Sequence, residues 1–212
     1  MADHCVIGYC HGGTVRAEFA ASLLAVAMEG ETHVDAVLAV GSGPNISTAR
    51  NMIARKFLEK PSPPWLFLAD TDMSFARDTV DRLIGAADPV ERPVVGGLCH
   101  SQNPDGGKPY PTMYELTERD GQLCFVRYKQ WPENTVVRVS ATGAACLLIH
   151  RTVLERVAKH ANDRAAPWFR ESVIGDALMG EDLTFCLRCG AAGIPVHVHT
   201  GVTVGHVKTA LI

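Results

Sequence analysis

The sequence predicts an α/β domain in which a mostly parallel central sheet is flanked by helices and accompanied by a small antiparallel ribbon. Strand-like and helix-like segments alternate over the first hundred residues, which is typical of such sheets. The apolar run Trp65–Ala69 is unbroken and bounded by turn residues, as expected for a strand buried on both faces. With 212 residues, no internal repeat and no linker, the chain is expected to form one domain over residues 1–212.

Four strands and three helices account for the first half of the chain. The strands are expected at residues 5–10, 34–40, 65–69 and 93–98. The helices are expected near residues 19–26, at 48–60 and at 76–86, because apolar residues recur there at helical spacing. Their buried faces would carry Phe19, Leu23 and Val26, then Ala49, Met52, Ile53 and Phe57, and then Val80, Leu83 and Ile84. Asn45 is a candidate helix cap, and prolines at 61, 63 and 64 end the second helix.

The second half of the chain is less regular. Residues 100–111 are polar and rich in glycine and proline, which predicts a loop. Ribbon strands are expected at 113–116 and 123–128, further strands at 136–139, 144–149 and 196–199, and helices at 152–160 and 181–192. Gly193 is suited to ending the last helix. Residues 162–179 show no clear periodicity and are interpreted as a mobile lid.

Two carboxylates follow the buried strand directly. Asp70 and Asp72 alternate along an extended chain, so both side chains can point the same way and approach one cation. Parallel sheets bind ligands beyond the carboxyl ends of their strands, which is where this pair is expected to lie. We therefore predict a divalent metal site here; the alternative is an ordinary exposed turn.

Two helix starts carry further candidates. Ser47, Arg50 and Asn51 lie in the first turns of a helix that follows a strand, where N–H groups and a guanidinium can hold an anion. Glu181 and Asp182 open the last helix, where the helix dipole favours negative charge. Asp182 is a candidate general base at the working edge of the sheet. The alternatives are a capped surface helix and a simple acidic helix start.

Two groups of residues that contain histidine are candidate metal sites. His206, combined with the carboxylates, suits manganese, and the nearby Lys208 can meet a phosphate. The set Cys186, Cys189, His197 and His199 has a spacing similar to that of zinc sites. That cysteine pair falls inside an amphipathic helix, however, so we expect it to belong to the core.

Taken in order, these blocks resemble the GT-A glycosyltransferases of the nucleotide-diphospho-sugar transferase superfamily, which includes the family 2 enzymes. The resemblance covers nearly the whole chain and implies a single GT-A, Rossmann-like domain. Its most specific part is the late block of residues 181–188, followed by 192–196 and by Gly205-His206. We expect a small free-standing form without the membrane anchor, lectin module or C-terminal helical extension of many relatives, similar to forms carried by bacteriophages and bacteria.

The resemblance implies a metal-dependent transfer of sugar from a nucleotide-sugar donor, most commonly a UDP-sugar, to an acceptor hydroxyl. It implies Mn²⁺ or Mg²⁺ on Asp70, Asp72 and His206, and catalysis by Asp182 with Glu181. Asp182 would deprotonate the acceptor in an inverting reaction; in a retaining one it would orient the acceptor or stabilise the oxocarbenium-like centre. The implied donor-binding residues are Tyr9, Ser47, Arg50, Asn51, Asp70, Thr71 and Lys208. Trp131 and Trp168 are candidates for stacking on a sugar, or else packing residues.

The acceptor is left open among a protein, a modified nucleobase, a glycan and a lipid carrier. A net charge of −3 gives no bulk attraction to nucleic acid, and no apolar run is long enough to span a bilayer. We see no signal peptide, and the seven scattered cysteines are interpreted as reduced thiols. The expectation is a protein of the cytoplasm of a bacterium or phage-infected host, with no membrane partner and no obligatory protein partner.

Two other functions fit parts of the pattern. The Asp70–Asp72 motif also resembles the nucleophile motif of haloacid-dehalogenase-type phosphatases. In that case Asp70 would attack phosphorus, Asp72 would act as acid and base, and Gly175-Asp176 with Glu181 would hold Mg²⁺. That family's motif normally lies on an early strand, and Gly175 would need a buried strand before it. The remaining alternative is a catalytically inactive nucleotide-sugar-binding domain.

Overall fold

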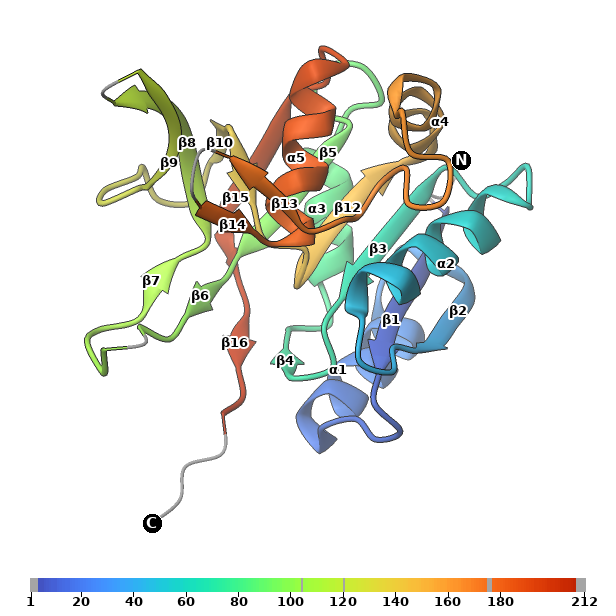
Figure 1. The fold of residues 1–212 in the computed structure, drawn as a ribbon. Coiled ribbons are helices and arrows are strands. Elements are labelled where there is room, and N and C mark those ends of the chain that lie inside the picture. The colour runs from blue at the N-terminus through green and yellow to red at the C-terminus, as the bar shows by residue number, and fades with distance from the viewer. Residues whose placement is uncertain (1–3, 104, 120, 175–176, 209–212) are drawn as a thin grey trace.

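A seven-stranded mixed sheet forms the centre of the fold (Figure 1). The computed structural model describes residues 4–103, 105–119, 121–174 and 177–208. The strand order is β10-β15-β5-β12-β3-β1-β2. The bounds are β1 His4–His11, β2 His33–Gly41, β3 Trp65–Ala69, β5 Val94–Leu98, β10 Val136–Val139, β12 Cys146–His150 and β15 Val196–Thr203. Strands β1, β2, β3, β5 and β15 share one direction, whereas β10 and β12 run against their neighbours. The expected mostly parallel sheet is confirmed.

Four small antiparallel sheets surround this centre. The ribbon consists of β8 (Met113–Arg119) between β9 (Gln122–Arg127) and β11 (Ala141–Thr142). The short pairs are β4 (Met73–Ser74) with β16 (Gly205–His206), β6 (His100–Ser101) with β7 (Tyr110–Pro111), and β13 (Ser172–Ile174) with β14 (Ala177–Met179). The predicted loop at 100–111 thus contains one of these pairs.

Helices cover both faces of the sheet. They are α1 (Ala17–Glu29), α2 (Ile46–Leu58), α3 (Thr79–Ala86), α4 (Arg151–His160) and α5 (Glu181–Ala191). Helices α2, α4 and α5 contribute to one apolar core cluster, and α1 and α3 to another (Figure 1). Strand β3 lies between them: Leu66 and Leu68 join the first cluster, while Phe67 joins the second. This placement explains why its apolar run is unbroken.

The buried face of α2 differs from the prediction. Met52 was expected to be buried but is 40% exposed, whereas Arg50 and Asn51 are buried. The buried face of α2 is wider than its apolar stripe. It includes polar residues whose side chains form hydrogen bonds within the protein. Asn45 caps α2 as expected, since its Oδ1 accepts a hydrogen bond from the Thr48 N–H at 3.1 Å.

The last third of the chain matches the predicted elements closely. Gly193 has a φ of +67° directly after α5, the left-handed conformation that suits glycine at a helix end. The 162–179 segment contains the β13–β14 hairpin, and its motion as a lid stays a prediction. Within the described part of the chain, no helix has the length and apolar content needed to cross a bilayer.

Candidate active site

The site lies at the carboxyl edge of the sheet, where β3 ends at Ala69. The turn that follows carries Asp70, Thr71 and Asp72 and leads into β4. Strand β16 pairs antiparallel with β4, so that His206 lies opposite Met73. The Val207 N–H also donates to the Asp72 carbonyl oxygen at 2.7 Å. This pairing brings the end of the described chain to the motif after β3.

Asp72 is the centre of one cluster. Its Oδ2 lies 2.8 Å from Nε2 of His206 and accepts a hydrogen bond from Nζ of Lys208 at 3.0 Å. Partial burial acts to raise the pKa of Asp72, but these two hydrogen bonds outweigh it and hold the pKa below its usual value. Asp72 is therefore a carboxylate at neutral pH.

The ring of His206 is held in one orientation. Its Nδ1 lies 3.1 Å from the carbonyl oxygen of His100, which only accepts hydrogen bonds, so Nδ1 carries a hydrogen. Nε2 is thereby directed at Asp72. Metal-binding histidines commonly show this arrangement, in which the second ring nitrogen is fixed by a carbonyl or carboxylate. The sequence held no signal for the part played by His100, because a backbone atom supplies it.

Arg50 is the centre of a second cluster. Its Nη2 donates to Oδ1 of Asp70 at 2.6 Å, and its Nη1 donates to Oε1 of Glu181. The Arg50 side chain is 5% exposed. Burial acts to lower its pKa, but the two carboxylates outweigh that effect and raise the pKa. Arg50 was expected to hold a donor anion; here it joins two carboxylates of the protein.

Asp182 lies beside this second cluster and is half-buried. Its Oδ1 accepts a hydrogen bond from the Leu183 N–H at 2.8 Å. At Gly180 the absence of a side chain matters, because a Cβ there would lie 2.9 Å from Oδ1, whereas a Cβ at Gly143 would make an ordinary contact with Oδ2 at 3.5 Å. Burial raises the pKa of Asp182 although Arg50 opposes the shift. A raised pKa makes the carboxylate a stronger proton acceptor.

Glu181 shows the same direction of shift. Burial raises its pKa against the opposing charge of Arg50, and the neighbouring Asp182 adds to the rise. The structure thus brings the predicted catalytic pair together with Arg50 and Asp70 at one edge of the sheet.

The other predicted donor-binding residues are placed differently. All the side-chain polar groups of Asn51 have partners inside the protein: its amide nitrogen donates to the carbonyls of Ser47 and Phe169, both at 2.7 Å, and its oxygen faces the N–H groups of Trp168 and Phe169. Tertiary contacts thus occupy the Asn51 amide in this structure, and donor binding by Asn51 stays a prediction. Ser47 is buried at the start of α2.

Tyr9 lies on β1, and Thr71 lies in the turn between β3 and β4, close to the carboxyl edge of the sheet. The Tyr9 ring packs edge to face on Phe19, with centroids 5.1 Å apart. The carbonyl oxygen of Thr71 accepts a hydrogen bond from the Arg16 N–H at 3.1 Å. Both contacts fix local structure, and donor binding by these two residues stays a prediction.

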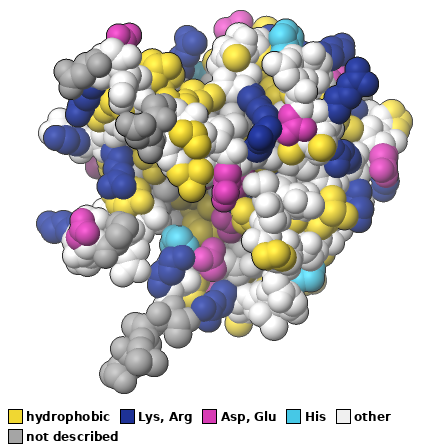
Figure 2. Space-filling model, in the orientation of Figure 1, with side chains coloured by type: hydrophobic (Ala, Val, Ile, Leu, Met, Phe, Trp, Pro, Cys, Tyr) yellow, Lys and Arg dark blue, Asp and Glu magenta, His cyan; other side chains and the backbone are white. Residues whose placement is uncertain are grey.

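A hollow of about 500 Å³ opens beside the Asp72 cluster. It is lined by β16, β6 and the chain between β6 and β7, and includes His206, Lys208, His100, Gln102 and Pro109. Figure 2 shows acidic side chains gathered in the middle of this face, next to a histidine and to basic side chains. A ligand that carries both phosphate and polar groups would find cationic and neutral partners there.

The structure places the candidate stacking tryptophans and the candidate zinc cysteines in or against the core. Trp168 is 4% exposed and its Nε1 donates to the Leu154 carbonyl, so it is a core residue, and Trp131 packs against the core. Cys186 exchanges hydrogen bonds with the backbone of Thr142. Cys186, Cys189, His197 and His199 do not form a metal-ligand group in the described part of the chain.

The phosphatase interpretation loses two of its requirements. Asp70 is bound by Arg50 rather than free to attack phosphorus. The strand before Gly175 is the short hairpin strand β13, whose Val173 is largely exposed, and not a buried strand. Gly175 and Asp176 themselves lie outside the described residues.

Comparison with known proteins identifies the fold. No family model and no curated protein matches the sequence. The structure of A197 from STIV is similar with a TM-score of 0.65 and 14% identity, over 97% of this chain and 86% of that one. The structure of GalNAc-T7 with UDP, GalNAc and Mn²⁺ is similar with a TM-score of 0.60 and 11% identity, over 97% of this chain and 43% of that one. This chain therefore shares the α/β fold of both structures, and it spans less than half of the GalNAc-T7 chain.

Proposed function

We propose that the protein is a metal-dependent glycosyltransferase that moves a sugar from a nucleotide-sugar donor, a UDP-sugar, to an acceptor hydroxyl. The observation that carries the proposal is the Asp72–His206 pair, with the imidazole fixed by the His100 carbonyl, at the carboxyl edge of the sheet. The shared fold supports it, since the similar GalNAc-T7 structure contains UDP and Mn²⁺.

The residues at this edge fit a divalent cation such as Mn²⁺ or Mg²⁺. Asp72 and His206 would hold it, and Asp70 would complete the set as the third predicted ligand. In this structure Asp72 and His206 are in direct contact, while Arg50 holds Asp70. A bound cation would neutralise the negative charge that grows on the diphosphate as the sugar leaves. The ammonium group of Lys208 lies beside Asp72 and would add to that effect.

Asp182 acts on the acceptor hydroxyl. With its pKa raised by burial, it is suited to accepting the proton of the attacking hydroxyl in an inverting reaction. In a retaining reaction it would orient the acceptor instead. Arg50 holds Glu181, and so fixes the start of α5 on which Asp182 stands.

The test is a thermal-shift screen of UDP and UDP-sugars, each with and without Mn²⁺. A ligand that binds only the folded state raises the melting temperature, by the equivalent of about 2.7 kcal/mol at a hundredfold excess over Kd. We expect a shift with a UDP-sugar that requires Mn²⁺ and is lost in Asp72→Ala. The matched control is Asp78→Ala, because Asp78 is exposed and its side chain caps no helix.

The outcomes separate the candidate functions. Equal shifts in wild type and Asp72→Ala would contradict the metal assignment. No shift with any sugar nucleotide, at any metal concentration, would contradict a donor site altogether. Metal-dependent binding with no release of UDP, with or without acceptor, would identify an inactive nucleotide-sugar-binding domain.

A further inference from the structure

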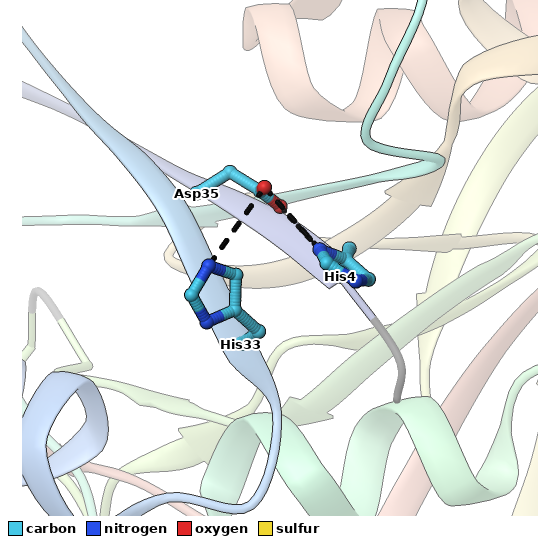
Figure 3. A group of neighbouring side chains, drawn as sticks. All are labelled: His4, His33 and Asp35. Carbon is cyan, nitrogen blue, oxygen red and sulfur yellow. Dashed lines mark hydrogen bonds and ion pairs between the residues drawn. The ribbon is translucent and has the colours of Figure 1, made fainter. Parts of the chain in front are cut away.

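Three side chains of types that can bind a metal ion lie together: His4, His33 and Asp35 (Figure 3). His4 opens β1 and His33 opens β2, and both strands run parallel to β3. Their first residues therefore lie at the other edge from Asp70, which follows the end of β3. Asp35 completes the group, and one ligand atom from each of the three residues lies within 4.8 Å of the others.

The backbone of β1 and β2 brings the group together. His4 and His33 are direct partners in the parallel register. His33 and Asp35 are two residues apart on one strand, which puts their side chains on the same face. The register then shifts: Val34 pairs with Cys5 and Ala36 pairs with Val6, so Asp35 has no partner in β1. Such irregularities redirect a side chain, and here the carboxylate of Asp35 faces both imidazoles (Figure 3).

We propose that His4, His33 and Asp35 bind a zinc ion, with water as the fourth ligand. Two imidazoles and one carboxylate are a ligand set that zinc accepts, and three protein ligands leave one position open. The site is separate from the active site, where two carboxylates and one imidazole suit Mn²⁺ or Mg²⁺.

The distances fit a small rearrangement around an ion. Ligand atoms about 2.0–2.1 Å from a tetrahedral zinc lie about 3.4 Å from one another. Nδ1 of His4 lies 3.2 Å from Oδ1 of Asp35, slightly closer than that, and Nε2 of His33 lies 4.0 Å from the same oxygen, slightly farther. Rotations of exposed side chains cover such differences, and His4 and His33 are 44% and 63% exposed. The ion can also reach them from solvent.

Neighbouring groups leave the three residues free for this role. Cys5 is the nearest thiol along the chain, but it points into the core cluster that contains Phe19 and is fully buried. Within the described residues, the His4 ring forms hydrogen bonds with Asp35 alone. A bound zinc would connect β1 to the edge strand β2, on which alternate residues are exposed.

Zinc binding is measured by calorimetry on the full chain with zinc alone as the probe. The Asp72→Ala variant serves as the background, because it removes the active-site pair as a competing site. We expect one zinc per chain in this background, and at least about tenfold weaker binding after His33→Gln, since one of three protein ligands is lost. His160→Gln is the matched control, because His160 is exposed at the end of α4. Equal affinity in the His33 variant and the control, or no binding in the background, would overturn the proposal.

Cobalt substitution identifies the ligands independently. Co²⁺ bound by imidazoles and a carboxylate gives only ligand-field bands, and these are expected to disappear with His33→Gln. A strong thiolate charge-transfer band would show that cysteines bind the ion and would overturn the assignment. Because both measurements use Asp72→Ala, their outcome does not depend on whether the proposed transferase activity is correct.

Discussion

Asp72 and Asp182 lie at one edge of the sheet in opposite environments. Hydrogen bonds from His206 and Lys208 hold the pKa of Asp72 low, whereas burial raises the pKa of Asp182. Two carboxylates whose pKa values are pushed apart suit different tasks. The first is suited to holding a cation, and the second to accepting a proton.

Asp182→Asn is expected to retain metal-dependent donor binding and to lose transfer by a factor on the order of 10²–10⁴, because the amide cannot accept the proton. The rate of transfer is measured as UDP release in the presence of acceptor, and binding by thermal shift. Transfer at a near wild-type rate would show that Asp182 is neither the base nor an essential acceptor contact.

The pH dependence of the wild type follows from the same group. A base must be deprotonated, so activity falls as the pH drops through the pKa of Asp182. Since that pKa is raised, the acidic limb of the rate profile is expected at a higher pH than the value of about 3.9 for an ordinary aspartate. A limb at or below that value would contradict the assignment.

Arg50 connects three elements of the fold. It stands on α2, and its guanidinium reaches Asp70 after β3 and Glu181 at the start of α5. These elements carry the predicted metal-binding and catalytic carboxylates. The buried guanidinium therefore sets the distance between the donor and acceptor sides of the site.

Arg50→Met is expected to lower the free energy of unfolding by roughly 3–5 kcal/mol, because it leaves two carboxylates without their counter-charge. The lower part of that range applies, since Asp70 is 29% exposed and water can compensate it in part. Denaturant unfolding measures the effect. The double variant Arg50→Met/Glu181→Gln is the control and is expected to recover part of the loss. A change below about 1 kcal/mol would show that the cluster is not a structural link.

The seven cysteines are distributed through the whole molecule, and all seven are free thiols. Six are buried, while Cys124 on β9 is partly exposed. Burial raises the pKa of Cys5, Cys146 and Cys186 to about 12 and that of Cys10 to about 11. The thiolate is the reactive form, so these thiols are protected both by burial, which excludes reagents, and by their raised pKa, which keeps them protonated.

In the native protein, a thiol reagent is expected to modify Cys124 first and the six buried cysteines only on unfolding. Mass spectrometry of the intact chain counts the modified thiols with and without denaturant. Cys124→Ser is expected to remove the fast phase. Rapid modification of several thiols in the native state would contradict the packing of both core clusters.

Local patterns in the sequence were sufficient for most of the elements. The apolar run of β3, the helical spacing on α3 and α4, and Gly193 after α5 each depend on neighbours within a few residues. A pattern of this kind also placed Asp70, Asp72, Glu181 and Asp182 at element ends. The position of β12 between β3 and β5, which makes the sheet mixed, could not be predicted from the sequence, because it depends on pairing between residues far apart along the chain.

The sequence by itself determined the α/β class, the order of most elements and the candidate carboxylates, since these follow from periodicity and turn chemistry. Only the tertiary structure decided which partners the polar residues have. In the folded chain Arg50 forms ion pairs with two carboxylates, and the Asn51 amide forms hydrogen bonds within the protein. A backbone carbonyl orients the His206 ring, and His4 lies beside His33 and Asp35. The reason is physical: hydrogen bonds and ion pairs are short-ranged in space, and the residues that form them lie far apart along the chain.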